Sequence, residues 1–293
     1  MKRVFVLLPL LCCAAVSRAQ VVLPFEVQAA HGRLAADDGL DALLATLTPG
    51  GERKAQLAAL AAIEQRAASL DFAGQYRVVA ALNEASASTF IAPEVRARAL
   101  MTLGKTAASF GDWTARREAV QALLEAATVD NPSDSRWESR LYAWLGLASV
   151  AGRLPPADDA IAQSVVTAVL DEERNDSRGP EKTAAMRVLH NLLLGEGPAA
   201  IYRSASLTQR VEDELLRPVE NGGMDRLYSD SDRGPEYRYC LLRSLYMLSW
   251  AQPDVHNIRQ RLAQVCEDVS RGDPSEELRY LARTYAEVLR RYR

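Results

Sequence analysis

Proline recurs along this chain of 293 residues at the start of acidic segments that are expected to be helices. Six such prolines lie 39 to 55 residues apart: Pro49, Pro93, Pro132, Pro180, Pro235 and Pro274. Proline fits the first turn of a helix, where its missing N–H is not needed, and acidic side chains suit the positive end of the helix dipole. A helix start that recurs about every 45 residues, with a second helical pattern between, predicts stacked helical hairpins.

The apolar spacing between the prolines predicts twelve helices in six pairs. Apolar residues recur at i, i+3, i+4 and i+7 in several stretches, such as Val120–Ala127 and Val255–Val269. Period-two alternation with β-branched residues does not extend over five positions anywhere, so we expect no sheet. Short connections rich in glycine and proline make successive helices antiparallel neighbours. We therefore predict an all-α fold, an α-solenoid of about six antiparallel hairpins, as one domain over residues 33–293.

One segment resembles a HEAT repeat. Val95 to Gly104, just after Pro93, contains a Val-Arg pair, a small residue three positions on and a Leu-Gly pair, as the second helix of that repeat does. Weaker echoes occur at Arg238 and Leu278. HEAT and armadillo-type proteins form right-handed superhelices that bind other proteins through the concave face. The resemblance therefore implies such a solenoid, with a protein or peptide ligand on the concave face.

The N-terminus has the pattern of a targeting segment. Two basic residues, an apolar run to Val16 and the sequence Ser17-Arg18-Ala19 match a signal peptide that is cleaved after residue 19. The pattern predicts a signal peptide at 1–19, an irregular segment at 20–32 and export to the periplasm or the extracellular space. The apolar run is too short for a membrane anchor, and no later run of 18 residues is apolar and uncharged, so we expect no membrane span.

Charge and histidine content argue against several classes of function. The net charge is −3 and no block of basic residues stands out, so we expect no nucleic acid as a partner. His31, His190 and His256 lie far apart, without the spacing of metal ligands or of a catalytic group. We therefore expect no metal site, no cofactor and no enzymatic activity.

Cys240 and Cys266 are the cysteines that remain after the predicted cleavage. They lie on consecutive helices, at nearly equal height on either side of a turn near Gln252, and an oxidising compartment allows a disulfide between them. Each lies at the flank of its apolar stripe, which can place the Cα atoms beyond the ~7 Å that a disulfide tolerates. A disulfide and two buried thiols both remain open.

The longest predicted connection is a loop insertion at residues 217–234. Loops longer than about 12–15 residues are uncommon in a compact domain unless they are functional or disordered. Asp230 and Asp232 could ligate calcium, but Pro235 stands where an EF-hand needs its glycine. A calcium loop, a partner-contact loop and a flexible insertion remain alternatives.

Aromatic residues gather near the C-terminus, where seven of the ten tyrosines follow residue 227 and Trp250 joins them. Tyrosine, tryptophan and arginine are enriched at recognition surfaces. Candidate contacts on the second helix of each pair are Arg96, Trp137, Arg140, Arg187, Tyr239 and Arg279. The sequence thus predicts an exported, non-enzymatic protein-binding or scaffolding protein.

Two alternatives remain. Six hairpins can also close into an (α/α)6 toroid, the fold of several glycan-acting hydrolases and lyases, which need two carboxylates or a Tyr/His/Arg set on loops at one end. Loop acids exist here, but few aromatic residues accompany them. A structural module that packs against an envelope protein is the other alternative, and the sequence does not distinguish it from a binding protein.

Overall fold

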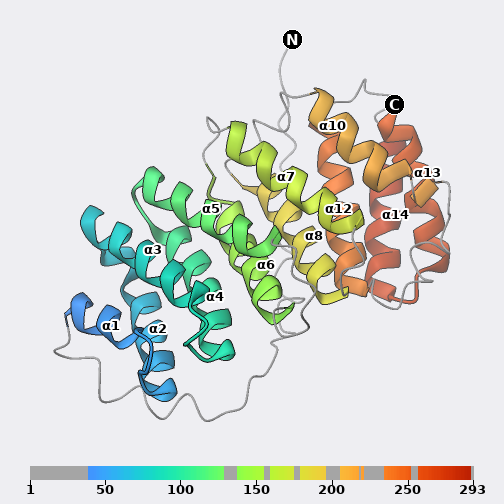
Figure 1. Cartoon of the computed structure of the whole chain (residues 1–293). Helices are drawn as coiled ribbons and strands as arrows, with labels where there is room; N and C mark the ends of the chain where they lie inside the picture. The colour runs from blue at the N-terminus through green and yellow to red at the C-terminus, as the bar shows by residue number, and fades with distance from the viewer. Residues whose placement is uncertain are drawn as a thin grey trace. The chain divides into compact units, whose positions relative to one another are not determined.

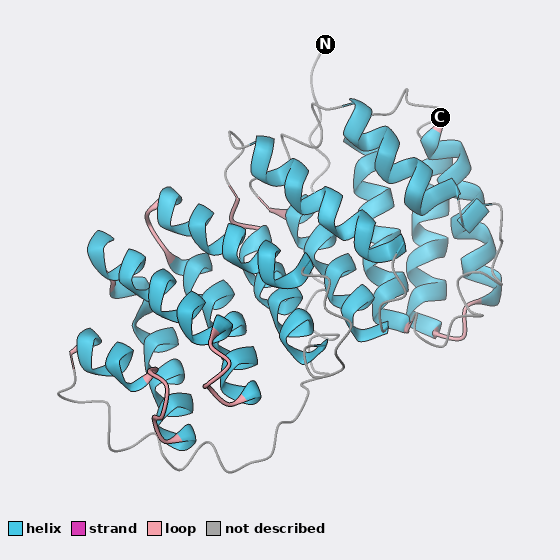
Figure 2. Ribbon diagram, viewed as in Figure 1, coloured by secondary structure: helices cyan, strands magenta, loops and turns pink. Residues whose placement is uncertain are grey.

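The computed structural model describes residues 39–128, 137–154, 159–174, 179–195, 205–217, 219–220, 234–251 and 257–291. Every regular element within these ranges is a helix (Figure 2), which confirms the all-α prediction. In this part of the chain, each helix falls short of the length and apolar character that crossing a membrane requires. The predicted signal peptide at 1–19, the segment at 20–32 and residues 221–233 lie outside the described ranges.

The helices form six pairs, which follow one another along the chain (Figure 1). The first helices of the pairs are α1 (Leu40–Thr46), α3 (Phe72–Ala87), α5 (Trp113–Thr128), α7 (Asp159–Arg174), α10 (Ala205–Val211) continued by the π-helix η4 (Glu212–Leu216), and α13 (Ile258–Gly272). The second helices are α2 (Arg53–Arg66), α4 (Pro93–Ser109), α6 (Trp137–Ala151), α8 (Gly179–Leu194), α12 (Pro235–Ala251) and α14 (Glu276–Arg291). A short 3-10 turn, η2 (Ala67–Ser69), follows α2.

Packing runs from each pair to the next and produces two layers. The second helices contact one another in series from α2 through α4, α6, α8 and α12 to α14, and we call them the second-helix layer. The first helices contact their partners and their neighbours, as α3 does with α4 and α5, and form the first-helix layer. No extensive interface between described helices joins the α1–α2 pair to the α13–α14 pair, as closure into a toroid would require. The described helices therefore form an all-α solenoid.

The recurring prolines mark the second-helix layer. Pro93, Pro180 and Pro235 lie in the first turns of α4, α8 and α12, where a missing backbone N–H costs no helical hydrogen bond. Pro49 and Pro274 stand shortly before α2 and α14. Pro132 precedes α6 in the sequence but lies outside the described residues. The proline period thus predicted the six helices of one layer.

A single hydrophobic cluster runs through the stack, from Leu43 in α1 to Leu289 in α14. Glycines let the second helices approach each other closely within it. A Cβ placed on Gly104 of α4 would lie 2.1 Å from the carbonyl oxygen of Gly146 of α6, and one placed on Gly195 would lie 2.2 Å from that of Gly152. The backbones therefore touch where α4 crosses α6 and just beyond the ends of α6 and α8, where only glycine fits.

Two predicted boundaries change. The repeat domain is predicted to begin at residue 33, but its first helix is described only from Leu40, with Gly39 at its N-cap. The loop predicted from residue 217 starts too early, because Arg217, Val219 and Glu220 are still helical. Val219 is buried, and Glu220 forms an ion pair with Arg261 of α13, so both residues are packed against the solenoid.

The two cysteines are buried as free thiols, Cys240 in α12 and Cys266 in α13. Burial raises the pKa of Cys240 to about 11 and that of Cys266 to about 12. Of the two alternatives that the sequence leaves open, the structure shows the pair of thiols. In the protonated form they behave as small apolar side chains of the core.

Candidate functional site

The middle four second helices each present one stripe of side chains that packing leaves partly exposed. The stripes follow the spacing i, i+4, i+7 and i+11, so each occupies one narrow face of its helix. Together they form what we call the second-helix face, in which His190 is the buried member. Its residues are Glu94, Arg98, Met101 and Lys105 on α4; Glu138, Tyr142, Leu145 and Ser149 on α6; Thr183, Arg187, His190 and Leu194 on α8; and Tyr239, Arg243, Tyr246 and Trp250 on α12.

At the N-terminal end of this face, polar contacts tie the stripe of α4 to the neighbouring helix α2. Glu64 of α2 accepts hydrogen bonds from Lys105, at 2.7 Å, and from Arg98, at 3.3 Å. Burial and the charge of Glu138 raise the pKa of Tyr142, while Arg98 of α4 acts in the opposite direction. The stripes of α4 and α6 are therefore electrostatic neighbours, and side chains of both signs lie on them.

The junction of α8 and α12 joins the next two stripes. Arg187 forms an ion pair with Glu236 in the first turn of α12. The ring of His190 meets the ring of Tyr239 edge to face, with 6.0 Å between their centroids. Aromatic pairs with this geometry stabilise a contact beyond the area that they bury. The predicted contact residues Arg187 and Tyr239 are thus brought close to one another.

The stripe of α12 is an aromatic ridge, which we define as Tyr239, Arg243, Tyr246 and Trp250. Arg243 donates from Nη1 to Oη of Tyr239 at 2.6 Å, and its guanidinium carbon lies 5.4 Å from the centroid of that ring. Tyr246 meets Trp250 edge to face, with 6.0 Å between centroids. Each ridge side chain therefore touches another one, which holds the ridge in a defined conformation.

The last helix pair, α13 and α14, supports the C-terminal half of the ridge. Tyr246 stacks on Tyr285 of α14, with 3.9 Å between ring centroids and 7° between ring planes. Arg259 of α13 places its guanidinium carbon 4.3 Å from the Trp250 centroid and donates from Nε to the carbonyl oxygen of Ser249 at 3.1 Å. Cations over aromatic faces add to the stability of such contacts. The ridge therefore rests on α13 and α14 and is not a set of loose side chains.

Arginines influence two buried titratable groups near the ridge. Burial lowers the pKa of His190 to about 4, and the charges of Arg243 and Arg187 contribute to that shift. The same two arginines favour the thiolate of Cys240, against the larger effect of burial. Arg187 and Arg243 thus lie close enough to His190 and Cys240 to influence both groups, although burial has the larger effect.

The remaining predicted contact residues all lie on second helices, but the structure does not bring them together. Arg140 is turned toward the first-helix layer, where it donates from Nε to the carbonyl oxygen of Ala127 at 3.2 Å and from Nη2 to the buried Glu172 at 2.7 Å. Arg279 of α14 donates to the carbonyl oxygen of Asp273 at 2.6 Å. Arg140 and Arg279 thus form hydrogen bonds with residues at or near the C-terminal ends of neighbouring helices.

Arg96 and Trp137 are half-buried in the first turns of α4 and α6. Nε of Arg96 is buried and has no hydrogen-bond partner within the described part of the chain. Neither residue belongs to a stripe of the second-helix face. The residue type and the position near a helix start suggested an exposed contact, but the pattern did not show which way each side chain points.

Arg243, Tyr246 and Trp250 complete the ridge but were not among the predicted contacts. The sequence contains a signal for them, because Tyr239, Arg243, Tyr246 and Trp250 repeat the i, i+4, i+7, i+11 spacing on a helix with a separate apolar stripe. A second stripe of aromatic and basic residues on one helix indicates a face that is not used for packing. This pattern would have identified the ridge.

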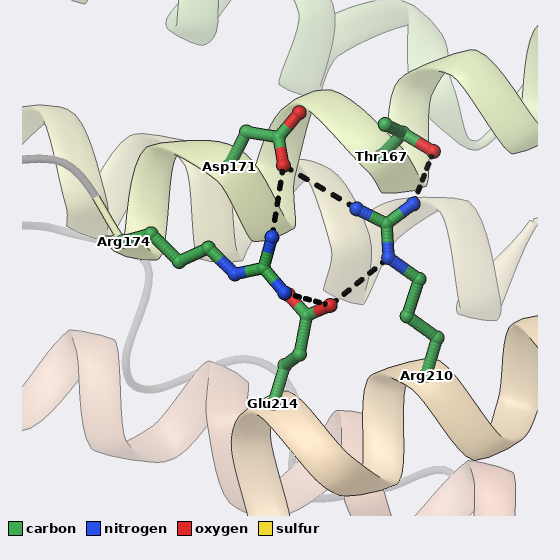
Figure 3. A network of polar contacts seen from close by, with 5 residues as sticks. All are labelled: Thr167, Asp171, Arg174, Arg210 and Glu214. Atoms are coloured by element: carbon green, nitrogen blue, oxygen red, sulfur yellow. Dashed lines mark hydrogen bonds and ion pairs between the residues drawn. The ribbon is translucent and has the colours of Figure 1, made fainter.

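The first-helix layer carries a different polar cluster, shown in Figure 3. Arg210 of α10 donates to Thr167 at 3.1 Å and to Asp171 at 3.3 Å, both on α7, and to Glu214 of η4 at 2.9 Å. Arg174 of α7 donates to the same Glu214 at 2.7 Å. The two arginines and the two carboxylates of this network neutralise one another's charge. The network therefore holds α10 and η4 against α7.

A shallow depression of about 570 Å³ lies beside this network, between α5 and α7. Thr128, Gln163, Ser164 and Asp171 contribute polar atoms to its wall. Among the described residues, no group of three histidine, cysteine, aspartate or glutamate side chains is arranged to hold a metal ion. The second-helix face is therefore the larger candidate for recognition.

Comparison with known proteins adds one finding on the fold. No protein-family model matches the sequence, and no curated protein matches it. A solved structure, the designed armadillo repeat protein YIII(Dq)4CqI, is similar over 86% of this chain and 100% of its own, with a TM-score of 0.53 and 15% sequence identity. The fold is an armadillo/HEAT-like repeat solenoid. At this identity the likeness concerns the fold alone, and the repeat pattern predicted from the sequence is confirmed.

Proposed function

We propose that this protein is an exported, non-enzymatic binding or scaffolding protein that holds a protein or peptide partner on its second-helix face. The observation that carries the proposal is the aromatic ridge, whose tyrosines, arginine and tryptophan are half-buried and fixed by mutual contacts. Rigid aromatic and arginine side chains lose little conformational entropy when a partner covers them. The armadillo/HEAT-like fold is compatible with this role.

The layer in which the ridge lies also supports the proposal. Second helices approach each other backbone to backbone at Gly104 and Gly146. In a curved helical solenoid, the helices on the concave side lie closer together than those on the convex side. The second-helix face is accordingly our choice for the concave, ligand-binding side.

The periplasm or the extracellular space is the proposed location. The proposal rests on the N-terminal sequence, where a basic start, an apolar run and small residues before residue 20 form the pattern of a signal peptide. Buried free thiols are compatible with an oxidising compartment, because oxidants reach a buried thiol slowly.

Selection from a library of random displayed peptides tests the binding function. Fluorescence anisotropy then measures the affinity of the enriched peptides for the unchanged protein and for a variant that carries Tyr142→Ala and Tyr239→Ala. Both tyrosines belong to the second-helix face, so we expect the variant to bind at least about tenfold more weakly, a loss of about 1.4 kcal/mol.

The matched control is Phe72→Ala, which removes an aromatic side chain that is 66% exposed on α3 in the first-helix layer. We expect this control to bind as the unchanged protein does. Equal loss in both variants, or binding that persists without the two tyrosines, would contradict the assignment of the second-helix face. Circular dichroism of each variant verifies that the helices are intact.

A further inference from the structure

We propose that Arg96 of α4 is a contact point for a carboxylate group of a partner protein. The inference adds a contact at the edge of the solenoid where the second helices begin, and it does not depend on the second-helix face. Three observations carry it: a motif that four second helices share, the groups that hold its arginine in three of them, and the absence of such a group from the described surroundings of Arg96.

Four second helices begin with the same two charged residues. Glutamate is the second residue and arginine the fourth in α4, α6, α12 and α14. Glutamate at this place suits the positive end of the helix dipole, whereas arginine does not, so the arginine needs another reason to recur. Because the arginines share one helix position, they occupy equivalent places in the stack. The pairs are Glu94 and Arg96, Glu138 and Arg140, Glu236 and Arg238, and Glu277 and Arg279.

In two of these helices, an acid at the end of the next first helix holds the arginine. Arg140 donates from Nη2 to Glu172, in the last turn of α7, at 2.7 Å. Arg238 donates from Nε and Nη2 to Asp273, which follows α13, at 2.9 and 3.1 Å. Both acids are buried. In the last pair, Arg279 donates to the backbone carbonyl of the same Asp273 at 2.6 Å. The position is thus built to receive a carboxylate from the pair that follows in the sequence.

For Arg96, the described residues hold no such acid. The matching place is the last turn of α5, where Ala126 stands two residues before the end of the helix, as Glu172 does in α7. Glu125, next to it, is exposed. Nε of Arg96 is buried and has no hydrogen-bond partner in the described part of the chain. Arg96 as a whole is half-buried, so a group from outside can reach part of its side chain.

The neighbouring first turns contain two acids. Glu94 forms an ion pair with Arg53 of α2, and Glu138 is exposed at the start of α6. A buried N–H without an acceptor is unfavourable, and a carboxylate that reaches Arg96 supplies one through a charge-assisted hydrogen bond. A guanidinium can hold a carboxylate with two nitrogens at once, as Arg238 does. The equivalent arginines therefore identify the ligand group as a carboxylate.

Ala126→Glu tests whether Arg96 has the same geometry as Arg140. The variant supplies from α5 the acid that Glu172 supplies from α7. Ala126→Gln is the matched control, because it adds a side chain of the same size without the charge. We expect the Glu variant to unfold at a temperature about 2–4 °C above that of the Gln variant, and the difference to vanish when Arg96→Met is added to both. Equal unfolding temperatures of the two variants would overturn the inference.

Two synthetic libraries of random decapeptides test binding of a carboxylate from outside, one with Glu and the other with Gln fixed at a central position. Both are selected on the purified full chain, and fluorescence anisotropy measures the affinity of the enriched peptides. We expect peptides from the Glu library to bind at least about tenfold more weakly to Arg96→Met. Ala126→Glu should weaken them to a similar extent, because its own carboxylate would occupy the guanidinium. Arg271→Gln is the control, since this side chain of α13 is 70% exposed, and it should leave the affinity unchanged.

Re-synthesis of the enriched peptides distinguishes the two sources of a carboxylate. Loss of affinity on replacing the central Glu by Gln assigns a side chain, and loss on amidating the C-terminus assigns a terminal carboxylate; either result supports the inference. If no peptide from either library depends on Arg96, water satisfies the guanidinium and the inference fails. Circular dichroism verifies that Arg96→Met keeps its helices.

An acid of the same chain is the remaining alternative. Asp130 and Asp134 follow α5 in the sequence and lie outside the described residues. If Asp130→Asn or Asp134→Asn lowers the unfolding temperature and Arg96→Met then causes no further change, the carboxylate comes from this chain and the inference fails. Peptides that need Arg96 but tolerate Tyr142→Ala and Tyr239→Ala support the inference even if the second-helix face binds nothing. The reverse dependence would contradict the inference and leave the proposed function in place.

Discussion

Single glycines set how closely the helices of this solenoid pack. Gly104 and Gly146 face each other across α4 and α6, and an added Cβ would lie 2.1 Å from a carbonyl oxygen. The HEAT-like pattern ends on Gly104, and the structure supplies the physical reason for a glycine there: the backbone of the next second helix occupies the space of a side chain.

Gly104→Ala should lower the free energy of unfolding by about 3 kcal/mol, because the new methyl group must push two packed helices apart. The gain in helix propensity from glycine to alanine, about 1 kcal/mol, offsets only part of this cost. Urea denaturation followed by circular dichroism measures the difference. Gly111→Ala is the control, since an added Cβ meets no atom within 4 Å there. A Gly104→Ala protein as stable as the control would contradict the close approach.

At the scale of helices, the sequence predicted one layer better than the other. The prolines and acidic first turns identified the second helices, because capping chemistry is local and visible in a few residues. The fifth first helix, α10 with η4, is one of the twelve that were predicted, but its π-helical turn was not. Arg261 of α13 forms ion pairs with Glu212 of η4 and with Glu220. Contacts between distant segments leave no mark on local periodicity.

In the candidate site, too, some features could be predicted from the sequence and others could not. The side-chain types and the helix that carries them could be predicted, and Arg187 and Tyr239 both lie at the contact between α8 and α12. The direction of each side chain could not, because Arg140 turns toward Glu172 and Ala127 of the other layer. Only the arrangement of three helices around Arg140 decides that outcome.

One buried ion pair locks three helices of the last two pairs. Arg238 of α12 donates from Nε and Nη2 to both carboxylate oxygens of Asp273, at 2.9 and 3.1 Å. Asp273 lies between α13 and α14, is fully buried and also accepts from the backbone N–H of Ser275 at 2.8 Å. Removing one partner leaves a buried charge without its counterion, which is the costly case for ion pairs.

Asp273→Ala should therefore lower the free energy of unfolding by about 3–5 kcal/mol. Chemical denaturation measures the change, and a second variant that combines Asp273→Ala with Arg238→Met should recover part of it, because it removes the uncompensated charge. Arg271→Ala is the control for an exposed ion pair, with an expected loss below about 0.5 kcal/mol. Similar losses in Asp273→Ala and in the control would show that the pair is not buried in solution.

At the scale of the whole molecule, each pair is stabilised by the pair before it and the pair after it. Central helices such as α4 and α6 contact helices of their own pair and of both adjacent pairs, whereas α1 is short and has one neighbouring pair. Stability in such stacks is a sum of local terms and nearest-neighbour terms. Local opening should therefore begin at the ends.

Hydrogen–deuterium exchange followed by mass spectrometry should show this gradient. Amides of α4, α6 and α8 are expected to exchange most slowly, and those of α1 at least about a hundredfold faster, which corresponds to about 2.7 kcal/mol. Peptides of α3 and α13 should lie between these limits. A single exchange rate for all six pairs would mean that the stack opens as one cooperative unit, contrary to this expectation.

The serial contact between pairs has a consequence for biosynthesis. Each new hairpin finds the surface that covers its apolar side on a segment the ribosome has already released, because packing partners lie next to one another in the order of translation. Nascent chains can therefore acquire their core progressively, without waiting for the C-terminus. A pause in translation would leave a shorter solenoid with one exposed apolar end, and not an unfolded polypeptide.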